Sequence, residues 1–188
     1  MNIFYVDECP AAAAIAMVDR HVVKMILESS QLLSTAHRVL DGDCVEVTLR
    51  NPETGKMRKK KVWVLHDARN DIMYNATHMN HPSAIWCRES VENYNWLGDH
   101  LYALCQEYTY RYGKVHKVQS SGLMLELLSP PYNLKAYEHT PMRIAMADEF
   151  KISDDPVINY RNYYRQGKQH LHKWTKRPAP EWIQDTAP

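Results

Sequence analysis

The longest helix-like pattern in the chain runs from Ala11 to Leu40. Apolar residues recur there at steps of three and four, and the run contains neither glycine nor proline. A possible break lies near Asp19, and Asp41-Gly42 is a typical stop signal. The pattern therefore predicts one long helix or two consecutive helices.

The pattern then changes from helical spacing to alternation. The stretches "CVEVTLR" and "KVWVLHD" alternate apolar and polar residues, and "NPETGKMRKK" separates them. Turn-forming residues gather between Asn51 and Gly55. We expect a β-hairpin within residues 43–66, inserted into an otherwise helical protein.

Helical patterning resumes after Asn80 and His81, with Pro82 in the first turn, and continues to Gly113. It predicts a second long helix, a shorter helix at about 118–128, and a last helix over Pro156–Trp174. The expected class is mainly α, a single compact helical domain over residues 1–188. The hairpin is its insertion, and residues 156–188 form a basic and aromatic C-terminal helix and tail.

Composition narrows the class of protein. At 45% hydrophobic residues the chain can bury a core, and no apolar run approaches the roughly 18 residues that would span a membrane. Four scattered cysteines suit reduced thiols, so we expect a cytoplasmic protein. The net charge of +1 indicates no particular partner, and neither composition nor charge determines the oligomeric state.

The first long helix carries an unusual polar stripe. His21, Lys24, Glu28 and Gln31 follow one another at steps of three, four and three, which places them on one side of a helix. The stripe borders the apolar face instead of opposing it, as in helices that line a cleft. An exposed Lys24–Glu28 pair, worth about 0.2–0.5 kcal/mol, is the plain structural alternative.

An amine beside a carboxylate can also cleave a glycosidic bond. The amine attacks the sugar carbon, and the carboxylate moves protons and stabilises the cation. We therefore take Glu28, Lys24 and His21 as candidate catalytic residues. Because only a neutral amine attacks, Lys24 is expected to be shielded from water.

Basic residues are interleaved with aromatic residues near the C-terminus, a composition that suits a phosphate backbone beside exposed bases. A solvated basic face over core aromatics is the alternative there. The hairpin run "GKMRKKK" also has two interpretations. Its cations could bind DNA, or its lysines could prevent an exposed strand edge from pairing with another chain. The candidate DNA-binding residues are Gln31, Arg88, Asn95, Arg111, Lys114, Tyr160, Arg161, Tyr164, Arg165 and Lys168.

Metal and nucleotide sites have little support. His78-x-x-His81 and His170-x-His172 have ligand-like spacing, but no acidic or cysteine partner lies nearby in the sequence. No glycine-rich phosphate loop is present. We expect no metal ion and no cofactor.

Three stretches together resemble the phage-type pyrimidine-dimer DNA glycosylase/AP lyase family, the endonuclease V type. "DRHVVKMILE" matches its Asp-x-His motif and the glutamate seven residues after the histidine, here Asp19, His21 and Glu28. "HPSAIW…NYNWLGDHLYALCQEYTYRYGK" is similar to its second long helix, and "NYRNYYRQGK" to its DNA-contacting tail. The hairpin and residues 117–150 have no counterpart.

The resemblance implies a phage-encoded, cytoplasmic enzyme that acts on a flipped pyrimidine nucleotide in double-stranded DNA. Glu28 then corresponds to the catalytic carboxylate. The family's nucleophile is an amino-terminal α-amine exposed by methionine removal, whereas here Asn2 follows Met1. Lys24, which stands where the family has a small residue, is expected to replace it. Leu27 and Gln31 occupy positions where the family has arginines.

The sequence thus favours a DNA glycosylase/AP lyase-like enzyme without a membrane association. One alternative keeps the scaffold but modifies a DNA or nucleotide base. The other is a non-catalytic DNA-binding protein, which full exposure of Glu28 would favour.

Overall fold

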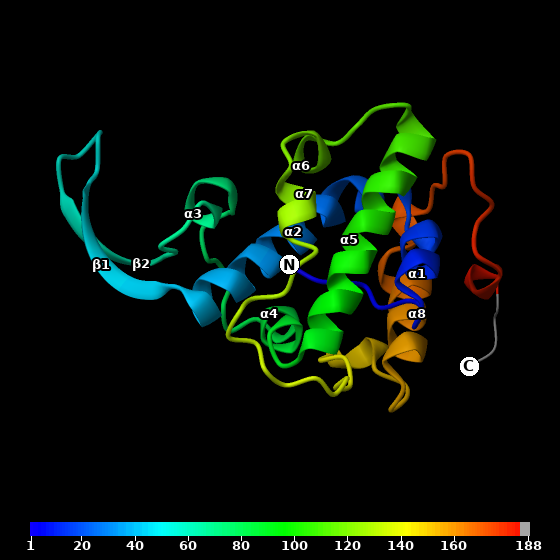
Figure 1. Cartoon of the computed structure of the whole chain (residues 1–188). Coiled ribbons are helices and arrows are strands. Elements are labelled where there is room, and N and C mark those ends of the chain that lie inside the picture. Colours follow the sequence, from blue (N-terminus) through cyan, green and yellow to red (C-terminus); the bar gives the residue numbers. More distant parts are fainter. Residues whose placement is uncertain (185–188) are drawn as a thin grey trace.

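The computed structural model describes residues 1–184 and is mostly helical (Figure 1). Its longer elements are α1 (Pro10–Ala16), α2 (Asp19–Asp41), β1 (Asp43–Arg50), β2 (Met57–Val64), α5 (Val91–Tyr112) and α8 (Pro156–Gly167). The shorter ones are α3 (Arg69–Ile72), α4 (Pro82–Cys87), α6 (Lys117–Ser120), α7 (Leu123–Glu126), η1 (Asp148–Phe150), η2 (Gln169–Leu171) and η3 (Glu181–Ile183).

Helices α2 and α5 form the centre of the core. Each presents a fully buried row of apolar side chains, which includes Ile26 and Leu33 on α2 and Leu97 and Leu101 on α5. Helix α1 packs on another side of α5 through small residues such as Ala14. The predicted break near Asp19 is confirmed, because residues 17 and 18 are extended and separate α1 from α2.

The prediction of a second long helix is wrong in one respect. The segment forms two helices, α4 and α5. Helix α4 ends at Cys87, and Arg88 leaves the helical conformation. Ser90 then starts α5 as its N-cap, with its hydroxyl accepting a hydrogen bond from Asn93 N at 3.1 Å. No glycine or proline marks this break, so only the capping serine signalled it.

Two later helices are also shorter than the pattern predicted. The helix expected at 118–128 is divided by Gly122, whose φ of 83° is left-handed, into α6 and α7. The last helix ends at Gly167 instead of continuing to Trp174. A Cβ atom at Gly167 would lie 2.6 Å from the Tyr163 ring and 2.9 Å from Phe150, so this close approach requires glycine.

The amino-terminal segment, residues 3–6, is buried, although it forms neither a helix nor a strand. Ile3 and Val6 are fully buried in extended backbone between the helices. Phe4 has a left-handed φ of 57° and stacks on His21 with ring centroids 4.2 Å apart. A left-handed backbone is costly for an aromatic residue, so packing must hold it there.

The predicted hairpin is confirmed, with β1 and β2 antiparallel from Asp43↔Val64 to Arg50↔Met57. It stands clear of the helices at the end of α2, at the left of Figure 1. In the part of the chain that the structure describes, no helix is both long and apolar enough to cross a membrane.

Candidate functional site

Glu28 is the centre of a polar cluster on α2. Its carboxylate is 2.9 Å from Lys24 Nζ through Oε1 and accepts a hydrogen bond from the Asn2 main-chain nitrogen, 3.1 Å away, through Oε2. Only 12% of the Glu28 side chain is exposed, whereas 62% of the Lys24 side chain is. One half-buried carboxylate therefore contacts two nitrogens from different parts of the chain.

The exposure of Lys24 corrects one expectation from the sequence. The sequence led us to expect an amine shielded from water, but most of the Lys24 side chain is exposed, and its Nζ contacts Glu28 there. Burial therefore does not shield this amine from water. Glu28 is the group within hydrogen-bond distance that can take its proton.

The position of the amino terminus was also not foreseen, since the sequence led us to expect Lys24 in place of an amino-terminal amine. Asn2 is held in place by its side chain, which donates to Ala145 O at 2.8 Å and accepts from the Tyr160 hydroxyl at 2.9 Å. These contacts bring the Asn2 nitrogen to Glu28. Tyr160 itself is fully buried, so its role is to anchor the amino terminus and not to stack on bases.

The charge of Glu28 also acts on His81. The pKa of His81 is lowered by burial, and then by repulsion from the amino-terminal ammonium and from His78, while Glu28 acts in the opposite direction. Among residues 1–184, neither His81 nor His78 forms a hydrogen bond or ion pair with Glu28, so their ligand-like spacing builds no metal site there.

His21, the first residue of the stripe, is buried and enclosed by aromatic rings. Its Nδ1 is 2.5 Å from the Tyr164 hydroxyl, and only 5% of the residue is exposed. Burial, with repulsion from Lys168, Lys24 and His170, lowers the pKa of His21 to about 3. The ring is therefore neutral at ordinary pH, and its contacts assign it to positioning Phe4 and Tyr164.

The C-terminal segment comes close to the start of α2, where the Asp19 main-chain nitrogen donates a hydrogen bond to Lys173 O at 2.9 Å. A hollow of about 420 Å³ lies at this point. Its lining residues are Asp19, Arg20, His170, Leu171, His172 and Lys173.

The remaining candidates are more scattered. Gln31 is half-buried one turn beyond Glu28, and its main-chain oxygen accepts from the Thr35 hydroxyl. Within residues 1–184, Arg88 and Asn95 make no hydrogen bond or ion pair with Lys24 or Glu28, and the Arg88 guanidinium donates to Ala84 O at 2.8 Å.

The remaining candidate DNA-binding residues, most of them near the C-terminus, differ in how far they are exposed. Arg161 is half-buried, donates to Val6 O and pairs with Asp7. Lys114 is exposed, and Lys168 lies over the Tyr163 ring. Arg165 is half-buried and donates to Trp182 O at 3.4 Å. Tyr164 is fully buried, so the alternative of a basic surface over core aromatics applies to it and to Tyr160.

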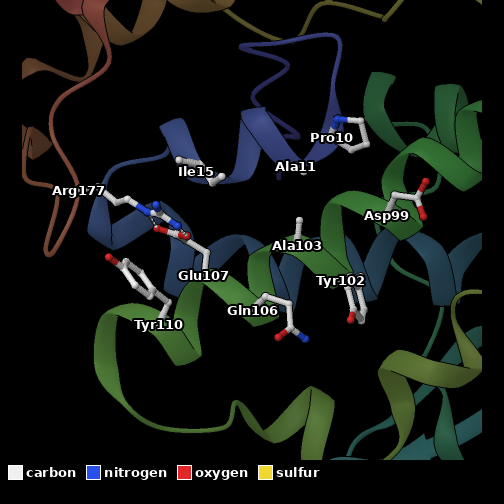
Figure 2. A pocket seen from close by; sticks show the side chains of 10 residues that line it. All are labelled: Pro10, Ala11, Ile15, Asp99, Tyr102, Ala103, Gln106, Glu107, Tyr110 and Arg177. Carbon is white, nitrogen blue, oxygen red and sulfur yellow. Dashed lines mark hydrogen bonds and ion pairs between the residues drawn. The ribbon is translucent and has the colours of Figure 1, made fainter.

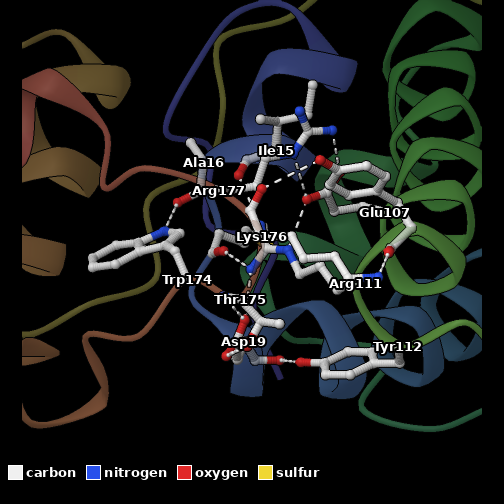
Figure 3. A network of polar contacts seen from close by, with 12 residues as sticks. Ile15, Ala16, Asp19, Glu107, Arg111, Tyr112, Trp174, Thr175, Lys176 and Arg177 are labelled. Carbon is white, nitrogen blue, oxygen red and sulfur yellow. Dashed lines mark hydrogen bonds and ion pairs between the residues drawn. The ribbon is translucent and has the colours of Figure 1, made fainter.

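Arg111 was predicted to bind DNA, but its guanidinium belongs to an interior network (Figure 3). It pairs with Glu107 at 2.7 Å and with Asp19 at 2.9 Å, and its side chain is fully buried. Burial alone would raise the pKa of Asp19, but hydrogen bonds from Thr175 and Arg111 outweigh it and lower that pKa. The network ties α2, α5 and the C-terminal segment together, so Arg111 cannot reach a phosphate.

Arg111→Met should consequently destabilise the fold by about 3–5 kcal/mol, because the buried carboxylate of Glu107 and the half-buried carboxylate of Asp19 lose their shared cation. Arg177→Met is the matched control. Arg177 also pairs with Glu107, at 2.9 Å, but 30% of its side chain is exposed. Urea denaturation should show a much smaller loss for the control, and equal losses would contradict an interior role for Arg111.

A separate apolar hollow of about 650 Å³ lies between α1 and α5 (Figure 2). Ile15 lines it from α1, and Ala103, Tyr102 and Tyr110 line it from α5. None of the stripe residues lines it. We therefore place the candidate site at Glu28 and not in this hollow.

No three histidine, cysteine, aspartate or glutamate side chains among residues 1–184 converge as metal ligands would. Comparison of the chain with known protein families, curated proteins and solved structures gave no match. The residues of the Glu28 cluster and the motifs of the sequence are therefore the features of this chain that bear on its function.

Proposed function

We propose that this protein is a DNA-base-processing enzyme, a glycosylase/AP lyase that acts on a flipped pyrimidine nucleotide of double-stranded DNA. The observation that carries the proposal is the contact of one half-buried carboxylate, Glu28, with the primary amine of Lys24 at 2.9 Å. Amine and acid are the two groups that imine-forming cleavage of a glycosidic bond requires.

In the proposed reaction, Glu28 takes a proton from the Lys24 ammonium, and the neutral amine attacks C1′ of the sugar. The bond from C1′ to the base breaks as the C1′–N bond forms, and the base leaves with its electron pair and takes the proton that Glu28 had accepted, which returns Glu28 to its carboxylate form. Opening of the sugar ring, with a proton moving from the attacking nitrogen to O4′, then gives an imine between Lys24 and C1′. Loss of the C2′ proton to Glu28 would expel the 3′ phosphate by elimination.

Two features of α2 support this proposal. Arg20, His170 and Lys173 line the hollow at the start of α2, where a phosphate of the bound strand would be attracted. The partial burial of Glu28 also distinguishes it from the exposed carboxylate expected of a non-catalytic binder. Gln31, half-buried one turn beyond Glu28, would meet the flipped base in this proposal.

A panel of duplexes, each containing one damaged or modified pyrimidine, tests the proposal. We expect release of a free base and cleavage of the strand 3′ to the abasic sugar on at least one member. The matched panel of single strands should react more slowly. Transfer of a chemical group to the base, with the glycosidic bond intact, would instead establish the base-modifying alternative. Binding without any covalent change would establish the non-catalytic one.

A further inference from the structure

The hairpin, residues 43–64, is a projecting two-stranded arm. Its strands contact each other and the end of α2, and the arm extends away from the helices (Figure 1). Val45 and Leu49 are 39% and 48% exposed. An isolated two-stranded hairpin is only marginally stable in water, so we expect a binding partner to stabilise an arm of this length.

The root of the arm is fixed to α2. Arg38 is 3% exposed and donates to Trp63 O at 2.8 Å on the arm, and to Met73 O and Tyr74 O on the next segment. At Gly42 a Cβ atom would lie 2.6 Å from Arg38 O and 2.8 Å from Val64 O, so the chain closes tightly there. The arm therefore has a set direction relative to the helix that carries Glu28.

Positive charge lies on both faces of the arm. The register places Arg58 and Lys60 on one face, and Lys59 and Lys61 on the other. The arm contains six lysine or arginine residues against three acidic residues. Of the acidic residues, Glu46 pairs with Lys59 and Asp43 with His66, each at 2.8 Å. The outer half of the arm therefore suits a partner that presents negative charge to both faces of the arm.

Aliphatic side chains share the face of Arg58 and Lys60. Val45, Val47 and Leu49 lie along β1 on this face. A second copy stacked on it would bring Arg58 and Lys60 of each chain into an apolar contact, where unpaired charges are costly. A DNA groove instead offers phosphates on both walls and thymine methyl groups on its floor, and the major groove admits a two-stranded ribbon.

We propose that the arm inserts into a groove of duplex DNA that flanks the nucleotide held at Glu28; the inference rests on the proposed function. Glu28 and Asp41 are separated by about 20 Å of helix, and the strands add about 26 Å. The tip therefore reaches at most about 45 Å from Glu28, or about 13 base pairs at 3.4 Å each. The substrate is consequently a long duplex and not a nucleotide or a short single strand.

Binding to duplexes that contain a stable abasic-site analogue tests this inference. One duplex has about 5 base pairs on each side of the analogue, and two others extend one side to about 20, beyond the roughly 13 within reach of the arm. The full-length chain should bind one of the extended duplexes roughly 100-fold more tightly than the short duplex at moderate salt, because the arm adds phosphate contacts only there.

The combined change Arg58→Ser, Lys60→Ser and Lys61→Ser should abolish that gain. It should also lower the slope of log affinity against log salt by about 2–3, since each lost phosphate contact accounts for about 0.9. The charge-preserving control, Arg58→Lys with Lys60→Arg and Lys61→Arg, should retain both. All three positions are exposed, and matching melting temperatures will show that the fold is kept.

Three outcomes would decide against this inference. Affinity that is independent of flank length would show that the arm does not touch DNA. Loss of the gain in the charge-preserving control would show that charge is not the cause. A dimer in sedimentation that dissociates on Val45→Thr with Leu49→Thr would make the arm a contact between copies.

Cleavage of the short duplex separates the two proposals. Flank-dependent binding without cleavage of any substrate refutes the proposed enzyme and leaves the arm assigned to DNA. Cleavage together with flank-independent binding refutes only the arm.

Discussion

Glu28→Gln should lower the rate of base release by about 10²–10⁴-fold, the range that general acid–base catalysis contributes. The carboxylate is the proposed proton acceptor for Lys24 and the proposed base for the elimination. Glutamine has the same shape and can still accept one of the two hydrogen bonds, from Lys24 Nζ or from Asn2 N. Folding and DNA affinity should therefore remain almost unchanged while turnover is lost.

The control for this variant is Glu126→Gln, which removes an exposed carboxylate on α7. It should have wild-type activity, and both variants should melt within a few degrees of the wild type. Single-turnover measurement on the best substrate of the panel separates the chemical step from product release. Full activity of Glu28→Gln would remove Glu28 from the reaction.

The elements predicted from the sequence were those with a strong local signal. The break before Asp19, the long helix after it, and the hairpin with its turn at Asn51–Gly55 are all confirmed. The division between α4 and α5 was missed because its signal is one capping serine, Ser90, within a continuous helical pattern. Sequence periodicity reports the buried face of a helix more reliably than its ends.

The candidate site was predicted only in part, because half of it comes from distant segments. Lys24 and Glu28 are four residues apart on one helix, so their contact could be read from the sequence. Asn2 is 26 residues from Glu28, and its position depends on a hydrogen bond to Tyr160 near the other end of the chain. No local pattern encodes such a contact.

Residue type was a weaker guide to exposure in the basic segments. Arg111 belongs to a cluster of basic residues in the sequence, yet it is enclosed because Glu107 and Asp19 compensate its charge in the interior. Tyr160 and Tyr164 alternate with surface cations, yet both are fully buried, on the inner side of α8. Helical spacing alone does not distinguish a tyrosine that stacks on bases from a core tyrosine whose hydroxyl forms a hydrogen bond inside the protein.

The amine is the second site at which a single change should have a very large effect. Lys24→Ala should abolish the covalent intermediate, because it removes the primary amine that lies 2.9 Å from Glu28. Lys24→Arg is the matched control for charge, since it keeps an ion pair with Glu28 but provides no nucleophile at neutral pH. It should bind DNA as the wild type does and form no adduct. An adduct in either variant would show that another nitrogen attacks.

Borohydride reduction during the reaction tests the central claim most directly, since it converts an imine between protein and DNA into a stable bond. With an abasic duplex, and with each damaged duplex on which base release occurs, we expect one trapped complex. Peptide mapping should place the DNA on Lys24, and acetylation of the amino terminus should leave the yield unchanged. An adduct on Met1 or Asn2 would assign the attack to the amino terminus beside Glu28 and contradict the role of Lys24. Absence of an adduct on every abasic and damaged substrate would contradict the lyase altogether.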